Sequence, residues 1–134
     1  MRNYLLFISL IFFLFSCSKA PDLKFNGSDI TEARLNSSFI LTSHLGKSTK
    51  LEDFRGKVVA IFFGFTYCPD ICPTTMYELK AIKNSLGDDG DKLQVIFVSL
   101  DPERDTTKLL KNYIPSFDSS FIGLTGSADS IKKL

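Results

Sequence analysis

The chain has 134 residues, 44% of them hydrophobic and 13 of them phenylalanine, which is enough for one domain with its own core. Its formal net charge is +1, and removal of the apolar N-terminal segment that contains Arg2 leaves 1 − 1 = 0. A neutral chain without a basic stripe offers no electrostatic basis for binding nucleic acid.

Residues 1–17 are predicted to be a lipoprotein-type signal peptide. Arg2 is a short basic region, and the apolar run from Tyr4 to Phe15 is too short to span a bilayer comfortably. The sequence Leu-Phe-Ser-Cys that ends at Cys17 resembles a bacterial lipobox, in which the cysteine is lipidated. We therefore expect an extracytoplasmic, periplasmic-side lipoprotein anchored to a membrane, with an ordinary signal peptide or a short anchor as alternatives.

Residues 18–37 are polar and predict a tether that leads into a domain spanning residues 38–134. Residues 39–41 and 50–51 flank a turn at Gly46, which is typical of a short hairpin. His44 lies in this turn, where a histidine is usually solvated. The continuous apolar run 57–65 then predicts a strand that is buried on both faces.

A helix is predicted from Thr74, because apolar residues recur there at three- and four-residue steps, and Pro73 suits its first turn. Its buried stripe would consist of Met76, Leu79, Ile82 and Leu86. Residues 93–100 predict a second buried strand, residues 106–113 a second helix, and residues 121–124 a short strand. Ser127 is predicted to cap a last helix. This alternation is typical of an α/β fold with a parallel sheet and right-handed crossovers.

Cys68 and Cys72 directly follow the first buried strand, and residues 101–106 follow the second. The carboxyl ends of parallel strands form the functional edge of such sheets, so the two segments should meet. A helix N-terminus lowers the pKa of a nearby thiol, and residues four apart share a helix face. Both sulfurs could therefore hold one soft ion such as Cu(I), or exchange disulfides.

Other interpretations of the cysteine pair fit less well. A closed zinc site needs four ligands, and a disulfide between these cysteines would stabilise the fold by only about 2 kcal/mol. The pair has three intervening residues, so it is no thioredoxin-type C-x-x-C motif. An inert buried pair is the remaining structural alternative.

Two long motifs carry a specific resemblance: GFTYCPDICP at residues 64–73 and VSLDPERDT at residues 98–106. With residues 25–30, 56–57 and 124–126, they are similar to the Sco/SenC family over about residues 25–134. Members of that family are membrane-anchored, thioredoxin-like copper proteins that assemble the CuA centre of cytochrome c oxidase. The resemblance implies a thioredoxin-like fold with a parallel or mixed sheet flanked by helices.

By this resemblance, Cys68 and Cys72 correspond to the two sulfur ligands of copper. Asp70 would lie between them without binding the metal, and Asp101, Arg104 and Asp105 would brace the edge of the site. A strand-to-helix turn with a surface ion pair is the simpler interpretation of that second motif.

The family also has a third copper ligand, a histidine, in a hairpin beyond the region where this chain ends. We therefore expect a C-terminally truncated domain that lacks its final hairpin and helix, with an unpaired sheet edge. His44 is not expected to replace the missing ligand. Cu(I) should be favoured, and Cu(II) binding is doubtful without that histidine.

The resemblance implies a copper chaperone that delivers copper to the CuA centre, rather than an enzyme. The alternative is an extracytoplasmic thiol–disulfide reductase or redox sensor in which Cys68 and Cys72 form the catalytic dithiol. Expected partners are the copper subunit of the oxidase or another copper or thiol protein, and a membrane through the lipid anchor. The sequence leaves the target protein open.

Overall fold

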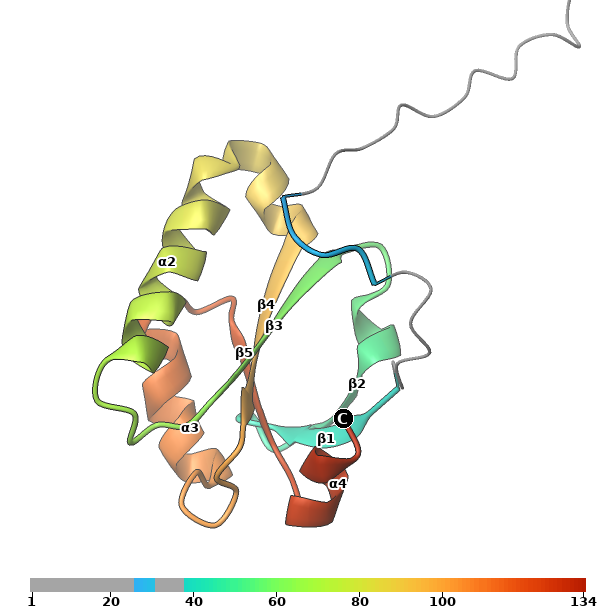
Figure 1. Ribbon diagram of the computed structural model, residues 1–134, viewed down its shortest axis with the longest axis vertical. Helices are drawn as coiled ribbons and strands as arrows, with labels where there is room; N and C mark the ends of the chain where they lie inside the picture. Colours follow the sequence, from blue (N-terminus) through green and yellow to red (C-terminus); the bar gives the residue numbers. More distant parts are fainter. Residues whose placement is uncertain (1–25, 31–37) are drawn as a thin grey trace, which may run out of the picture. The chain divides into compact units, whose positions relative to one another are not determined.

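The computed structural model describes residues 26–30 and 38–134 (Figure 1). The predicted signal peptide with Cys17, and most of the predicted tether, lie outside these residues. Residues 38–134 belong to one compact unit. Its elements are β1 (Ile40–Ser43), β2 (Ser48–Lys50), the 3-10 turn η2 (Leu51–Phe54), β3 (Val58–Gly64), α2 (Ile71–Ser85), η3 (Gly87–Lys92), β4 (Leu93–Ser99), α3 (Thr107–Tyr113), η4 (Ile114–Ser116), β5 (Ile122–Thr125) and α4 (Ala128–Lys132). Among the described residues, no helix is long and apolar enough to cross a membrane.

The five strands form one mixed sheet in the order β2-β1-β5-β4-β3. Strands β3, β4 and β5 are parallel, whereas β1 is antiparallel to both β2 and β5. The predicted hairpin is confirmed, and Gly46 turns it with φ 76°, a left-handed conformation that glycine adopts readily. The parallel strands bring the ends of β3 and β4 together, because Gly64 pairs with Ser99.

The prediction that the first apolar run is buried on both faces was wrong. Within the described part of the chain, β3 is at the edge of the sheet and pairs only with β4. Val58, Ile61 and Phe63 on it are 69%, 40% and 45% exposed. The apolar composition predicts a strand, but the position of that strand depends on pairing with distant residues.

Helices cover the two faces of the sheet around separate cores (Figure 1). One face packs under α2 and α3, around Met76, Phe97, Leu110 and Ile114. The other packs under η2 and α4, around residues that include Ile96, Val98 and Leu124 of neighbouring strands. Strand β4 contributes to both cores and is almost entirely buried, as predicted.

The helix after the cysteines begins earlier than predicted, at Ile71 rather than at Thr74. Its inward stripe is also shorter. Met76 is fully buried, but Ile82 and Leu86 are 52% and 45% exposed. The early start places Cys72 in the first turn of the helix.

Candidate functional site

The end of β3 and the loop after β4 meet at one edge of the sheet. The backbone N–H of Leu100 donates to the carbonyl of Gly64 at 2.8 Å, which continues the parallel pairing past both strands. The chain then turns through residues 65–70 into α2, while residues 100–106 connect β4 to α3. The two motifs of the sequence therefore lie side by side, as the strand order predicts.

Cys68 and Cys72 are both free thiols and are arranged around the first turn of α2. The backbone N–H of Cys72 donates to the sulfur of Cys68 at 3.3 Å. Cys68 is half-buried, whereas only 5% of Cys72 is exposed. One sulfur is thus accessible to a partner or an ion, and the other lies beneath it.

The two thiols have opposite electrostatic environments. A hydrogen bond from the Cys72 side chain, followed by backbone N–H groups of the first helical turn, lowers the pKa of Cys68. Burial, followed by the hydrogen bond to Cys68, raises the pKa of Cys72. Cys68 is therefore the thiol that ionises first, so near neutral pH it supplies more of the thiolate that reacts with disulfides and binds metal.

Gly64 makes room for the buried sulfur, a role that sequence reasoning missed. A Cβ at this position would lie 3.2 Å from the Cys72 sulfur and 2.9 Å from the rings of Phe62 and Phe97. Any side chain would displace at least one of them. In the sequence, this role of Gly64 was indicated only by the position of the glycine at the end of the predicted strand.

Asp105 lies behind the cysteine loop and is completely buried. Its Oδ1 accepts a hydrogen bond from the Thr66 hydroxyl at 2.5 Å, and its Oδ2 accepts from the Thr66 backbone N–H at 3.0 Å. The Ser99 hydroxyl donates to the same Oδ2 at 2.6 Å. Neither Thr66 nor Ser99 was a candidate from the sequence, because their role depends on this long-range contact.

Asp101 and Arg104 form an ion pair at the surface of the β4–α3 loop. Their hydrogen bond raises the pKa of Arg104. The guanidinium carbon also lies 5.1 Å from the ring centroid of Tyr67, the residue before Cys68. The surface ion pair that was expected for a simple strand-to-helix turn is therefore present, and its arginine also contacts the cysteine loop.

Asp70 precedes α2 at the N-cap position, but its side chain accepts no capping hydrogen bond. It is exposed and lies in the loop between the cysteines. Its backbone carbonyl accepts from the N–H of Thr74 at 3.2 Å and so helps to form the first turn.

The expectation that His44 is solvated was wrong, because only 5% of it is exposed. Its ring Nδ1 accepts from the backbone N–H of Gly123 at 3.1 Å, and the backbone N–H of His44 donates to the Gly123 carbonyl at 2.7 Å. These bonds place it on the β1 side of β5, three strands from β3. At about 4.8 Å per strand it is roughly 14 Å from the strand that leads to the cysteines.

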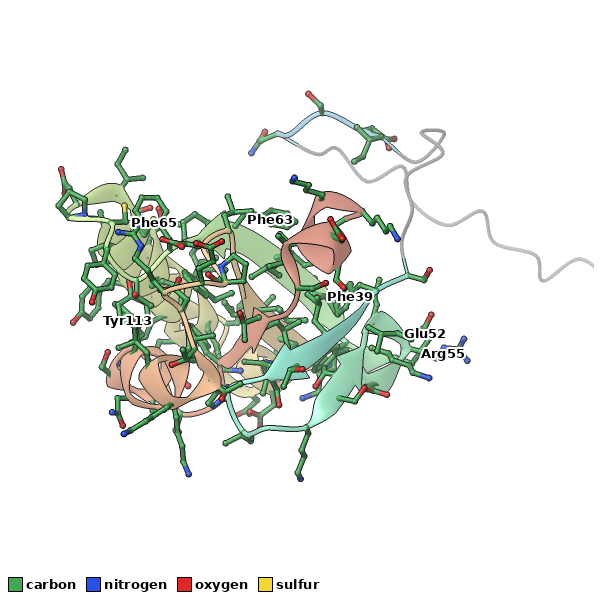
Figure 2. All side chains as sticks on the ribbon, turned by 90° about the horizontal axis from the view of Figure 1, so that it is seen from below. Phe39, Glu52, Arg55, Phe63, Phe65 and Tyr113 are labelled. Carbon is green, nitrogen blue, oxygen red and sulfur yellow. The ribbon has the colours of Figure 1, made fainter. Side chains whose placement is uncertain are left out.

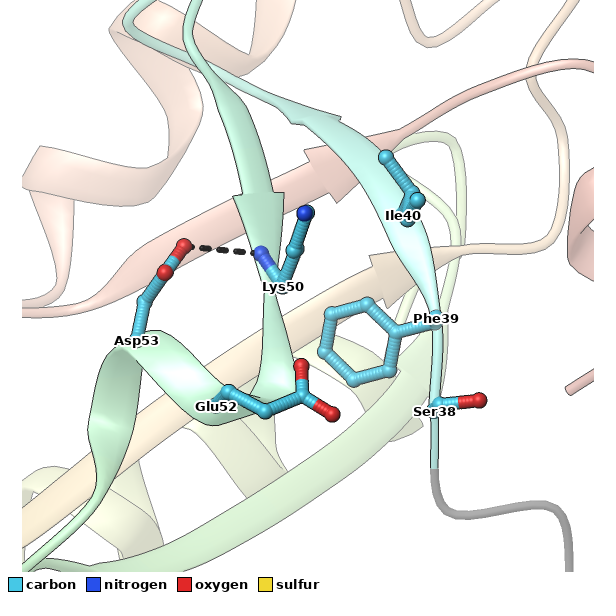
Figure 3. Close-up of a pocket in the computed structure, with 6 residues that line it drawn as sticks. All are labelled: Ser38, Phe39, Ile40, Lys50, Glu52 and Asp53. Atoms are coloured by element: carbon cyan, nitrogen blue, oxygen red, sulfur yellow. Dashed lines mark hydrogen bonds between the residues drawn. The ribbon is translucent and has the colours of Figure 1, made fainter.

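Within residues 26–30 and 38–134, no cluster of three or more histidine, cysteine or acidic side chains could hold a metal ion. The structure also has an open hollow of about 560 Å³ at the start of β1 (Figure 3). Its lining residues are Ser38, Phe39, Ile40, Lys50, Glu52 and Asp53. In Figure 2, Phe39 and Glu52 lie on the opposite side of the molecule from Phe65, which begins the cysteine loop. This hollow is therefore separate from the thiols.

Comparisons with known proteins agree with these features. The family model SCO1/SenC matches residues 27–134. A similar curated protein is "Protein SCO2, mitochondrial" of Saccharomyces cerevisiae, 42% identical over 101 residues that cover 75% of this chain. The match covers 34% of the yeast protein, so this chain spans about a third of the length of that relative.

Solved structures of Sco proteins have the same fold. Copper-bound ScoI of Bradyrhizobium japonicum matches with a TM-score of 0.69 and 43% identity, over 74% of this chain and 63% of that one. A SCO1/SenC family lipoprotein from Bacillus anthracis matches with a TM-score of 0.64 and 30% identity, over 72% of this chain and 60% of that one. BsSco matches with a TM-score of 0.61 and 29% identity, over 72% of this chain and 58% of that one. It is described as a Sco-family cytochrome c oxidase assembly protein with a disulfide switch. The mixed sheet with its flanking helices is therefore the thioredoxin-like fold that was predicted.

Proposed function

Because this chain belongs to the SCO1/SenC family, we propose that it binds Cu(I) through Cys68 and Cys72 and delivers it to the copper centre of cytochrome c oxidase. The observation that carries the proposal is the arrangement of the two thiols around one helical turn, with the Cys72 N–H 3.3 Å from the Cys68 sulfur. The copper-bound ScoI structure, 43% identical to this chain, supports the same cargo.

The donor set favours the monovalent ion. Thiolates are soft donors that suit Cu(I), for which two sulfurs form an adequate linear site, whereas Cu(II) prefers more donors of the nitrogen and oxygen type. The described residues bring no third histidine, cysteine or acidic side chain to the pair. In this proposal Asp70 lies beside the ion without binding it. Arg104, paired with Asp101, supports the cysteine loop through its contact with Tyr67.

Titration of the reduced full chain with each copper ion tests this proposal. We expect one Cu(I) per chain, much weaker binding of Cu(II), and loss of the tight Cu(I) site in Cys68→Ser and Cys72→Ser. Cys17→Ser is the matched control, because it removes a thiol outside the pair and should leave the stoichiometry unchanged. Equal affinity for both ions, or a tight site that survives both substitutions, would contradict the proposed site.

Delivery is tested separately with the copper-binding domain of the oxidase subunit as acceptor. Copper-loaded chain should pass one Cu(I) to the reduced acceptor, and Cys72→Ser should not. The alternative, a thiol–disulfide reductase, predicts a different result. The metal-free, reduced chain would then reduce one disulfide in the oxidised acceptor while its own Cys68 and Cys72 are oxidised to a disulfide, and copper transfer would not occur.

We also propose that lipid on Cys17 holds the protein at the periplasmic side of a membrane. The support is the lipobox-like sequence, together with the similar Bacillus anthracis protein that is described as a lipoprotein. Cells that express the chain should incorporate labelled palmitate into it, and Cys17→Ser should abolish the label. Palmitate incorporation that persists in Cys17→Ser would rule out this anchor.

A further inference from the structure

Asp105 is an unusual residue for the interior, because a buried carboxylate needs partners to offset its desolvation. It is completely buried, and no lysine or arginine among the described residues forms an ion pair with it. The neighbouring Arg104 pairs with Asp101 instead. The direct partners of the Asp105 carboxylate are therefore hydrogen-bond donors, and such bonds to a carboxylate are strong and directional.

Those hydrogen bonds join three segments at the edge that carries the thiols. Thr66 donates twice, from its hydroxyl at 2.5 Å and its backbone N–H at 3.0 Å. Ser99, the last residue of β4, donates at 2.6 Å, and its hydroxyl oxygen also accepts from the Asp101 N–H at 3.0 Å. One carboxylate thus fixes the end of β3, the end of β4 and the start of the following loop.

Thr66 is the position through which this anchor reaches the cysteines. It lies two residues before Cys68, whose backbone N–H donates to the carbonyl of Phe65 at 3.2 Å and closes a tight turn. The loop between β3 and α2 is connected to a distant part of the chain by the hydrogen bonds of Thr66 to Asp105. A shift of Thr66 would therefore move Cys68 relative to Cys72, which is fixed in α2.

We propose that Asp105 is a positioning residue that acts through Thr66 to hold Cys68 at the separation from Cys72 that a two-sulfur site requires. This inference rests on the proposed function only for its copper readout. The spacing of two sulfurs also governs how readily they form a disulfide, and that property is independent of metal.

The test compares Asp105→Asn, Asp105→Ala and Thr66→Val in the full chain, solubilised in detergent. An asparagine can keep the arrangement, because its oxygen accepts from the Thr66 N–H and Ser99 while its amide donates to the Thr66 hydroxyl oxygen. Competition with a chromogenic Cu(I) chelator should show wild-type affinity within a fewfold in Asp105→Asn. Asp105→Ala should lose about tenfold or more, the usual effect of removing a group that orients a metal ligand. Thr66→Val, which lacks the hydroxyl donor, should give an intermediate loss.

Gln94→Ala is the matched control for a lost buried polar group. Gln94 is 8% exposed, lies near the start of the same strand β4, and donates to the Ser120 carbonyl at 2.9 Å. The Gln94→Ala substitution should lower thermal stability without changing the affinity for Cu(I). If Asp105→Ala only lowers stability in the same way and binds Cu(I) as tightly as the wild type, the positioning role is refuted. If Asp105→Ala does not fold, wild-type affinity in Thr66→Val refutes it instead.

A metal-free measurement separates this inference from the proposed function. In a glutathione redox buffer the two thiols are oxidised to one disulfide, while one glutathione disulfide is reduced to two thiols. The effective concentration of Cys68 toward Cys72 should fall about tenfold or more in Asp105→Ala and remain near the wild-type value in Asp105→Asn. Wild-type chain that binds no copper refutes the proposed function, whereas unchanged effective concentrations across these variants refute the role of Asp105.

Discussion

Cys68 and Cys72 have the same side chain, yet the first turn of α2 gives them different reactivity. The more accessible sulfur, that of Cys68, accepts hydrogen bonds from the Cys72 side chain and from backbone N–H groups, which lower the pKa of Cys68. Burial of the other sulfur, followed by its hydrogen bond to Cys68, raises the pKa of Cys72. Cys68 should therefore make first contact with an incoming ion or thiol.

Substitution of Cys72 tests this asymmetry in a Cys17→Ser background, where Cys68 is the remaining thiol. Cys72→Ala removes the side-chain hydrogen bond that is the largest cause of the lowered pKa of Cys68. That pKa should therefore rise, and alkylation of Cys68 near neutral pH should slow severalfold. Cys72→Ser retains a hydroxyl donor and should be intermediate. The measurement is the alkylation rate as a function of pH. Identical pH profiles for the two variants would show that the side-chain hydrogen bond does not control the thiolate.

Gly64 is a second residue whose effect should be local. In Gly64→Ala, the new Cβ must displace the Cys72 sulfur or the rings of Phe62 and Phe97, which should cost about 1–3 kcal/mol of stability. Displacement of the sulfur should also speed alkylation of Cys72 in the native protein. Gly27→Ala is the control, because nothing lies within 4 Å of a Cβ there. It should stay within about 0.5 kcal/mol of the wild type, and equal melting temperatures for both variants would exclude the clash.

At the scale of elements, β3 leads to the site and, among the described residues, has one unpaired edge. Its sequence VVAIFFG contains no charge, and within the described residues only β4 pairs with it. Ile61 and Phe63 are also 40% and 45% exposed. Apolar edge strands of this kind pair readily with other chains, so the protein should self-associate as its concentration rises.

A lysine on β3 should oppose that association. Phe63→Lys is expected to raise the concentration at which oligomers appear severalfold, because a charge on an edge strand disfavours pairing between copies. Ile40→Lys is a suitable control, since Ile40 is 64% exposed on β1, which is paired on both sides. Light scattering over a concentration series measures the effect. Equal reduction by both substitutions would mean that general surface hydrophobicity, rather than the β3 edge, drives association.

At the scale of the whole molecule, features encoded by neighbouring residues were predictable from sequence. Gly46 at the hairpin turn was anticipated, and so were the helix starts at Thr106 and Ser127, whose side chains accept from the backbone N–H groups of Leu109 and Ser130. The almost entirely buried β4 also agrees with its continuous apolar run. Each of these signals lies within one or two turns of the chain, so no distant contact is needed to interpret it.

Features that depend on distant contacts were not predictable in the same way. The exposure of β3 follows from the order of strands, which its own composition does not specify. The contact between Thr66 and Asp105 spans 39 residues, and the space beside Gly64 is defined by Phe97 and by Cys72 in α2. The resemblance to a family identified the cysteines, but only the folded chain shows which groups hold them in place.

His44 gives a prediction for the stability of the whole domain, because it joins the β1–β2 hairpin to β5 through Gly123. Burial lowers the pKa of His44 below its ordinary value of 6.5, and a nearby lysine, Lys111, adds to this effect. A ring nitrogen that accepts an N–H must also be unprotonated, which agrees with a neutral imidazole in the folded state.

Because the folded-state pKa is depressed, the contribution of His44 is fully present above pH 6.5 and is lost as the pH falls toward the folded-state value. For one proton the slope is at most about 1.4 kcal/mol per pH unit. The chain has a single histidine, so urea denaturation between neutral pH and mildly acid pH should isolate the effect against His44→Asn, whose side-chain oxygen can accept the same N–H without titrating. As the pH falls, the unfolding free energy of the wild type should decrease relative to that of His44→Asn. A constant difference across this range would show that His44 does not titrate differently in the folded and unfolded chains.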